Sequence, residues 1–312
     1  MAQEAAQKSD DQKVPVSGVI GITMGDAAGI GPEVTAAALR SGRLDKRFRY
    51  EVIGACSSAQ PGRPDAATAR AALAALEESV LLLRCGEIAA VVTAPVCKSA
   101  LAAEGFLFPG QTEFYAGRLG APDFVMCLTG PHLTVGLVTI HEPLRRVPDL
   151  ITPEAILRTG RLLTEFVQRR GKSNPRIAVA GLNPHAGEDG HMGTEDAGVI
   201  LPAVEQLREL LPHATFSAPL PPDTLFHQAA HGAWDAVVCM YHDQGLIPLK
   251  LLDFDCAVNV TLGLPFVRTS PDHGTAFGIA GQGIASAESM IAAINLAAEL
   301  SAAGQAGDRR EE

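Results

Sequence analysis

Short apolar runs alternate with longer amphipathic stretches along most of the chain. Gly18–Thr23 is an apolar run that predicts a strand, and Pro32 suits the first turn of a helix that continues to about Arg40. The same pattern predicts strands at Ile88–Thr93, Thr134–Ile140, Ile177–Gly181 and Ala236–Met240. It predicts helices at Ala66–Arg84, Pro153–Arg170, Thr194–Leu211 and Ser286–Ala303. This alternation indicates an α/β protein with a mainly parallel sheet.

The ends and the interior contain few breaks in this pattern. The first sixteen residues are polar and predict a disordered lead-in without the apolar stretch of a signal peptide. The proline-rich stretch Ser217–Asp223 resembles a linker but is too short to separate independent domains. Since no apolar run approaches the roughly 20 residues that cross a bilayer, we expect a cytoplasmic protein with no membrane partner.

Charge and cysteine usage exclude some classes of function. The formal net charge of −10 disfavours a nucleic-acid partner, because a surface of that sign repels a phosphate backbone. A small anionic substrate is compatible with this charge if a local pocket of Lys and Arg receives it. The six cysteines form no C-x-x-C pair, which indicates reduced thiols rather than a zinc site built from cysteines.

Three histidines follow predicted strands. His141 comes directly after Thr134–Ile140, while His185 and His242 follow the next two strands after short turns. The carboxyl ends of parallel strands meet at one edge of a sheet, so residues far apart in the sequence converge there. Neutral imidazole is a common ligand for divalent metals, although a single histidine in a loop is more often only a polar loop residue. Acidic residues close to these histidines or suited to orient them are Glu188, Asp243 and Asp223.

Two further segments indicate substrate and nucleotide binding. Lys250 and Arg268 lie in apolar, glycine- and proline-rich surroundings with Asn259 between them, and Lys and Arg are the usual partners of phosphate and carboxylate. The sequence has no G-x-G-x-x-G after a strand, no P-loop and no G-x-S-x-G. A nucleotide would therefore need another glycine-rich element, for which Asp272–Gly283 is the candidate.

Several long motifs together resemble the 4-hydroxythreonine-4-phosphate dehydrogenase family of vitamin B6 synthesis. These motifs are Ile22–Glu33 (ITMGDAAGIGPE), Thr93–Pro95 (TAP), Phe108–Glu113 (FPGQTE), Leu182–Glu188 (LNPHAGE), Tyr241–Gly245 (YHDQG), Asn259–Pro265 (NVTLGLP) and Arg268–Ala276 (RTSPDHGTA). The resemblance implies a two-lobed fold like that of isocitrate and isopropylmalate dehydrogenases, working as a homodimer with a shared active site. It implies a nucleotide-binding lobe of residues 17–94 plus 255–312, and a metal, substrate and dimerisation lobe of residues 95–254.

The resemblance also implies roles for individual residues. The metal ligands would be His141, His185 and His242, holding one divalent ion, which could be zinc, magnesium, manganese or cobalt. Substrate contacts would come from Gln111, Thr112, Lys250, Asn259 and Arg268. Contacts to NAD or NADP would come from His273, Gly274, Thr275, Ala276 and Gly281. The general base stays open between a lysine such as Lys250, an aspartate such as Asp223, and water.

The implied reaction is NAD(P)-linked oxidation of 4-phosphooxy-L-threonine to a 3-keto acid, which decarboxylates to 3-amino-2-oxopropyl phosphate. One position departs from the family pattern, because Gln111 stands where Gly-His-Thr-Glu usually has histidine. A 4-phospho-D-threonate or 4-phospho-D-erythronate dehydrogenase is therefore an alternative. A metal-dependent phosphohydrolase and a ligand-binding protein without catalysis are further alternatives that would use the same residues.

Overall fold

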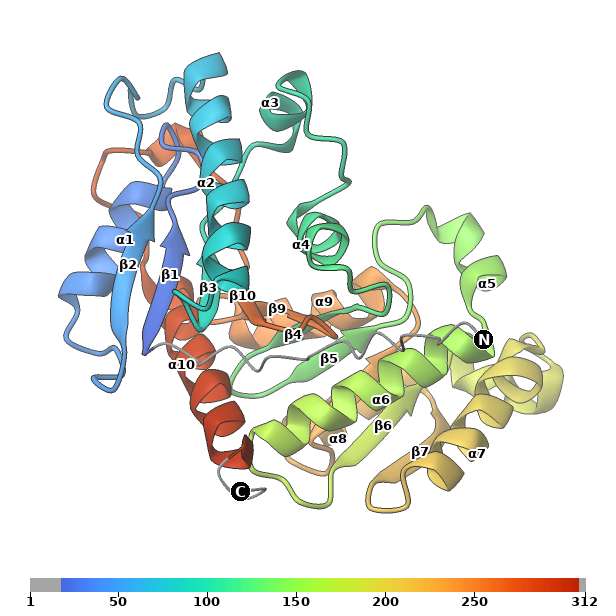
Figure 1. The fold of residues 1–312 in the computed structure, drawn as a ribbon. Helices are drawn as coiled ribbons and strands as arrows, with labels where there is room; N and C mark the ends of the chain where they lie inside the picture. The colour runs from blue at the N-terminus through green and yellow to red at the C-terminus, as the bar shows by residue number, and fades with distance from the viewer. Residues whose placement is uncertain (1–17, 309–312) are drawn as a thin grey trace, which may run out of the picture.

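One large sheet runs through the whole protein. We describe it from a computed structural model that covers residues 18–308, and the predicted lead-in at residues 1–16 lies outside this range. The strand order is β2-β1-β3-β10-β9-β4-β5-β8-β6-β7 (Figure 1). The strands are β1 (Val19–Thr23), β2 (Arg49–Ile53), β3 (Ala90–Thr93), β4 (Val125–Thr129), β5 (Thr134–Leu137), β6 (Arg176–Ala180), β7 (Thr215–Leu220), β8 (Ala236–Cys239), β9 (Val258–Leu262) and β10 (Val267–Pro271).

The sheet consists of two parallel blocks joined by two antiparallel strands. β2, β1, β3 and β10 form one parallel block, and β5, β8, β6 and β7 form the other. Between them, β9 pairs antiparallel with both β10 and β4, and β4 pairs antiparallel with β5. The prediction of a mainly parallel α/β sheet is therefore confirmed, and the antiparallel centre is what the sequence pattern missed.

Two of the longest helices begin at residues whose side chains cap them. Asp65 Oδ1 accepts a hydrogen bond from the Thr68 N–H at 2.8 Å and starts α2, while the Thr152 hydroxyl accepts from the Ala155 N–H at 3.2 Å and starts α6. The helices are α1 (Gly31–Arg40), α2 (Ala66–Arg84), α3 (Lys98–Ala103), α4 (Gln111–Leu119), α5 (Val147–Leu150), α6 (Pro153–Arg169), α7 (Leu201–Leu210), α8 (Pro222–Ala230), α9 (His242–Asp253) and α10 (Glu288–Asp308). Within the described range, no helix is long and apolar enough to span a bilayer.

One face of the sheet carries a continuous apolar core. Val34 of α1, Ile294 of α10, Leu163 of α6 and Leu207 of α7 belong to a single buried cluster that also takes in the strands beneath them. Figure 1 shows α10 and α6 lying along this side of the sheet. This shared core joins the two blocks into one body.

The opposite face is divided into two separate cores. Leu76 of α2 packs with Phe114 and Tyr115 of α4 in one cluster, and Leu246 and Leu249 of α9 belong to another. α4 and α9 therefore belong to different clusters on this face of the sheet. α3 and α4 pack against α2, although the predicted division at residue 94 assigns them to the second lobe. That division stays a prediction.

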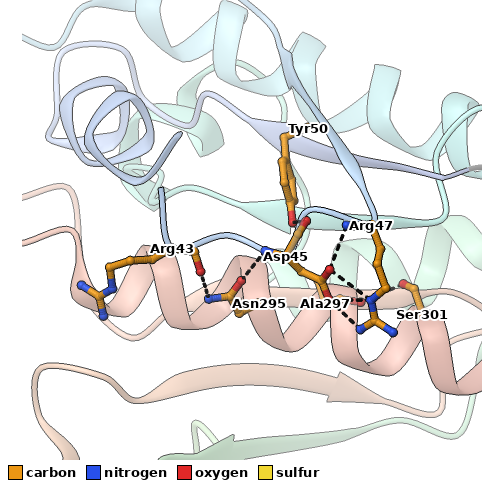
Figure 2. Close-up of polar contacts among 7 residues, drawn as sticks. All are labelled: Arg43, Asp45, Arg47, Tyr50, Asn295, Ala297 and Ser301. Atoms are coloured by element: carbon orange, nitrogen blue, oxygen red, sulfur yellow. Dashed lines mark hydrogen bonds and ion pairs between the residues drawn. The ribbon is translucent and has the colours of Figure 1, made fainter. Parts of the chain in front are cut away.

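The loop that leads from α1 to β2 is fastened to the last helix. Asn295 Oδ1 of α10 accepts a hydrogen bond from the Asp45 N–H at 3.1 Å, and Asn295 Nδ2 donates to the Arg43 carbonyl at 3.2 Å (Figure 2). The Tyr50 hydroxyl donates to the Asp45 carbonyl at 2.7 Å. The neighbouring Arg47 guanidinium, 2.6 Å from Asp45 Oδ2, lowers the pKa of Asp45. These contacts attach the first part of the chain to its last helix.

Most predicted elements are confirmed, with two differences. The helix predicted at Thr194–Leu211 begins instead with a π-helical turn at Asp196–Ile200, which leads into α7. The linker interpretation of Ser217–Asp223 is wrong, because this stretch completes β7 and begins α8. β7 is an edge strand of the sheet. The N–H that Pro219 lacks is therefore not needed to bond a further strand.

Candidate active site

Two of the three predicted metal ligands lie together at one edge of the sheet. β5, β8 and β6 are parallel neighbours, so their carboxyl ends share an edge. There the rings of His141 and His242 are 5.6 Å apart, centroid to centroid. His242 Nδ1 lies 2.7 Å from Asp243 Oδ1, which leaves Nε2 available to a ligand. A carboxylate that binds the second ring nitrogen is typical of metal-ligating histidines.

The third predicted ligand lies apart. His185 is exposed in the turn η2 (Pro184–Gly190), which follows β6, and its closest acidic partner is Glu188 at 3.5 Å. Among residues 18–308 of a single chain, no three His, Cys, Asp or Glu side chains are arranged to hold a metal. The expected convergence of three histidines within one chain is therefore only partly met, which is compatible with a site completed by a second subunit.

A pocket of about 350 Å³ collects most of the predicted substrate and nucleotide residues. It lies on the divided face of the sheet, between α4 and α9. The predicted residues that line it are Gln111, Thr112, His141, Lys250, Asn259, Arg268, His273 and Gly274. Others, to which the sequence analysis assigned no individual role, are Thr93, Lys98, Glu113, Ser270 and Asp272. The charged members are three cations and two carboxylates, so the pocket is cationic although the chain is acidic.

Arg268 is a buried cation without a carboxylate bonded to it. Only 3% of its surface is exposed, and its guanidinium donates to the hydroxyls of Thr93 at 2.5 Å and Thr261 at 3.2 Å. Its buried Nε has no hydrogen-bond partner. Burial lowers the pKa of Arg268 to about 10. A buried cation that contacts mainly neutral acceptors is typical of a site that receives an anion.

The first turn of α4 lies beside Arg268. Gln111 Oε1 accepts from Arg268 Nη2 at 3.5 Å, and Gln111 Nε2 donates to the Ala94 carbonyl at 3.3 Å. The Thr112 hydroxyl lies 3.5 Å from that of Thr261. The free N–H groups of a helix N-terminus favour an anion, and here Arg268 adds a full positive charge to them. The departure from the family pattern at position 111 thus places an uncharged amide against the cation.

Lys250 has an acidic partner that sequence reasoning missed. Lys250 Nζ lies 3.1 Å from Asp272 Oδ2. Burial raises the pKa of Asp272, and the Lys250 ammonium acts in the opposite direction. The available signal was its place in Ser270–His273, an acidic residue at the end of a strand directly before the glycine-rich segment. Burial and the Lys98 ammonium also lower the pKa of His141, which favours the neutral imidazole that binds metals.

The glycine-rich segment lies against the turn that follows β1. The Thr275 carbonyl accepts from the Ile30 N–H at 2.9 Å, and the Gly281 N–H donates to Glu33 Oε2 at 2.9 Å. Ala276 adopts φ = +43°, in the left-handed region. His273 Nε2 is buried without a hydrogen-bond partner and its residue lines the pocket, which provides a polar group for a ligand.

Asp223 does not belong to this group of residues. It is exposed in the first turn of α8 and does not line the pocket. Its predicted role in proton transfer stays a prediction, and the structure offers Asp272 as the carboxylate nearest to Lys250.

Known proteins are similar to this chain over most of its length. The profile of the pyridoxal phosphate biosynthetic protein PdxA family matches residues 22–297. The chain belongs to the PdxA family. A curated 4-hydroxythreonine-4-phosphate dehydrogenase of Bradyrhizobium diazoefficiens is 48% identical to this chain over 292 residues. The match covers 90% of this chain and 83% of that protein.

Solved structures have the same architecture as this chain. The crystal structure of 4-hydroxythreonine-4-phosphate dehydrogenase from Klebsiella pneumoniae is similar with a TM-score of 0.77 and 36% identity, covering 91% of this chain and all of that one. An isocitrate dehydrogenase from Methylococcus capsulatus shares the fold alone, with a TM-score of 0.51 and 15% identity over 94% of this chain and 87% of that one. The predicted relationship to the isocitrate dehydrogenase fold is therefore confirmed for this PdxA family member.

Proposed function

We propose that the protein catalyses the metal-dependent, NAD(P)-linked oxidation of 4-phosphooxy-L-threonine. The C3 carbon gives the hydride of its C–H bond to the nicotinamide, its hydroxyl gives a proton to the protein, and the resulting 3-keto acid releases CO₂ to give 3-amino-2-oxopropyl phosphate. The observation that carries the proposal is the cationic pocket around the buried Arg268, to which no carboxylate is hydrogen-bonded. Membership of the PdxA family supports the choice of substrate.

The phosphate would bind at Arg268 and the first turn of α4. The guanidinium, the Thr112 hydroxyl and the Gln111 amide surround one end of the pocket, and each offers a hydrogen-bond donor to phosphate oxygens. A phosphate there would also use the donor capacity of Arg268 Nε, which is unsatisfied in the chain alone. Fixing the phosphate holds the rest of the substrate against the centre of the pocket.

Lys250 and Asp272 would handle the proton of the C3 hydroxyl. As Lys250 Nζ takes the hydroxyl proton, it passes one of its own to Asp272 Oδ2, 3.1 Å away. The burial that raises the pKa of Asp272 makes its carboxylate a better proton acceptor. Asn259, whose buried Oδ1 has no partner, would accept a hydrogen bond from the substrate.

The histidines fit a divalent metal. His141 and His242 are adjacent, and Asp243 orients the ring of His242. His185 would complete the set across the subunit interface. A divalent ion bound there supplies Lewis-acid stabilisation of the negative charge that develops on the substrate oxygen. Imidazole ligands suit zinc and cobalt, whereas magnesium and manganese prefer oxygen ligands, so we expect zinc or cobalt to bind most tightly.

The nicotinamide nucleotide would lie along His273–Gly283. Gly274 is exposed at the pocket, where a residue without a side chain allows close approach of a ligand to the backbone. His273 Nε2 would bind a polar group of the nucleotide, and the Thr275 carbonyl holds the segment against the turn after β1.

A homodimer would be formed through α9. Ile247, Leu251 and Phe254 are 66%, 84% and 71% exposed and follow each other at helical spacing along one face. The same helix begins with His242 and carries Lys250 close to its end. A second copy of the chain packed on this face would therefore lie next to the metal ligands, where His185 of one subunit can reach the site of the other.

An NAD(P)-linked assay with 4-phosphooxy-L-threonine tests the proposal. We expect NAD(P)H formation that a chelator abolishes and zinc or cobalt restores. Turnover of only 4-phospho-D-threonate or 4-phospho-D-erythronate would assign the chain to the alternative substrate. Release of inorganic phosphate without a nucleotide would instead indicate a phosphohydrolase.

A further inference from the structure

The turn that carries His185 has an unusual backbone. Five consecutive residues adopt positive φ angles: His185 (+53°), Ala186 (+54°), Gly187 (+86°), Glu188 (+41°) and Asp189 (+53°). Four of them have a Cβ atom, which in this region approaches the following carbonyl oxygen, so each is disfavoured by sterics. A left-handed turn of this length persists only where surrounding contacts hold it.

Asp196, at the start of the next helical segment, binds the two residues that lead into this turn. Asp196 as a whole is 2% exposed. Asp196 Oδ1 accepts from the Leu182 N–H at 2.8 Å, and Asp196 Oδ2 accepts from the Asn183 N–H at 3.1 Å and from Asn183 Nδ2 at 3.0 Å. The amide of Asn183 also donates to Glu195 Oε2 at 2.8 Å. The two residues that immediately precede Pro184 and His185 are thus fixed by one buried carboxylate.

Two glycines make room for the Asp196 carboxylate and for the Asn183 amide that it binds. A Cβ atom on Gly181 would lie 2.7 Å from Asp196 Oδ1 and 3.0 Å from the Ala186 side chain. A Cβ atom on Gly193 would lie 2.6 Å from Asn183 Nδ2. Gly181, directly after β6, and Gly193, in the loop before Asp196, therefore allow the carboxylate, the Asn183 amide and the turn to come together.

We propose that Asp196 is a positioning residue whose buried carboxylate, together with Asn183, holds the left-handed turn at His185–Asp189 and so sets the place of the His185 imidazole. This inference rests on the proposed role of His185 as a metal ligand. Asp196 itself touches neither metal nor substrate. Since the turn is disfavoured by its own sterics, loss of the carboxylate lets it relax toward ordinary backbone angles and moves the imidazole away.

The test compares two isosteric substitutions that remove the same charge. Asp196→Asn replaces one of the accepting oxygens by an NH₂ group, which cannot accept from the amides of Leu182 or Asn183. Asp189→Asn is the matched control, because Asp189 is exposed in the same turn and both Asp and Asn tolerate left-handed angles. Co²⁺ affinity of the full-length protein is measured by its absorption spectrum, and amide hydrogen exchange across residues 182–192 is measured without metal.

We expect Asp196→Asn to weaken Co²⁺ binding by about 10- to 100-fold and to speed exchange in the turn. Asp189→Asn should match the wild type in both measurements. If Asp196→Asn binds Co²⁺ as tightly as Asp189→Asn does, the inference is wrong. If Asp196→Asn does not fold, Asn183→Ala takes its place, because it removes only the side-chain bonds to Glu195 and Asp196. Hydrogen exchange in the turn of Asn183→Ala that is as slow as in the wild type would then overturn the inference.

A third variant separates this inference from the proposed function. His185→Ala should weaken Co²⁺ binding at least as much as Asp196→Asn does. If His185→Ala leaves Co²⁺ affinity unchanged, the proposed metal role of His185 is wrong. Faster exchange in Asp196→Asn would in that case still support the positioning of the turn.

Discussion

Replacing Arg268 by methionine should abolish phosphate binding without destabilising the free protein. Burial lowers the pKa of the guanidinium from 12.5 to about 10. At about 1.4 kcal/mol for each pKa unit, the folded chain disfavours the cation by about 3 kcal/mol, an order-of-magnitude figure. Because the charged form is the disfavoured one, this cost is present at every pH below about 10.

The substitution also removes favourable contacts. Arg268 donates to the hydroxyls of Thr93 and Thr261, and each such hydrogen bond contributes about 1 kcal/mol to stability. The expected losses of about 2 kcal/mol nearly offset the gain of about 3 kcal/mol. Arg268→Met should therefore leave the free energy of unfolding within about 1 to 2 kcal/mol of the wild type, unlike most substitutions of buried side chains.

Thermal unfolding with and without inorganic phosphate provides the assay. Phosphate at about 100 times its Kd stabilises a binding-competent protein by about 2.7 kcal/mol, so the wild-type midpoint should rise by a few degrees and that of Arg268→Met should not. Loss of the charged hydrogen bonds should lower kcat/KM by about 100-fold or more. Arg169→Met is the control, since burial also lowers the pKa of Arg169, which lies outside the pocket. A midpoint that rises with phosphate in Arg268→Met as in the wild type would refute the reasoning.

Three further predictions follow from the same structure. Lys250→Met should lower kcat by about 100-fold or more, because the Asp272 carboxylate loses the ammonium that passes it the substrate proton. A variant that keeps a tenth of the wild-type kcat in steady-state kinetics would contradict this. Gln111→His places an imidazole, which ordinarily titrates near pH 6.5, against Arg268, whose charge disfavours the imidazolium. The kcat/KM of the variant should therefore depend on pH below about pH 7 in a way that the wild-type kcat/KM does not, which a pH profile of both proteins measures. Leu251→Glu puts a charge on the apolar face of α9 and should produce monomers in sedimentation velocity, and an unchanged dimer would exclude this face as the interface.

Elements with strong local signals could be predicted from the sequence. The α2 helix has the predicted bounds of Ala66–Arg84, because its capping box and its small apolar residues act within the segment itself. The antiparallel centre of the sheet was missed. β9 and β10 owe their place to pairing with strands far away in the sequence, and no periodicity within either segment reports which neighbour it will find.

The candidate site divides in the same way. The residue types of Lys250, Arg268 and the three histidines indicate phosphate and metal chemistry, and the sequence motifs alone identify the family. Only the tertiary structure brings Arg268 against Gln111, because α4 and β10 meet across 157 residues of chain, and gives its guanidinium hydroxyl rather than carboxylate partners. It also joins Lys250 to Asp272, sets His141 beside His242, and separates His185 from both. The sequence by itself determined which chemical groups are available, and the packing of α4 and α9 over an antiparallel sheet decided which of them act on one ligand.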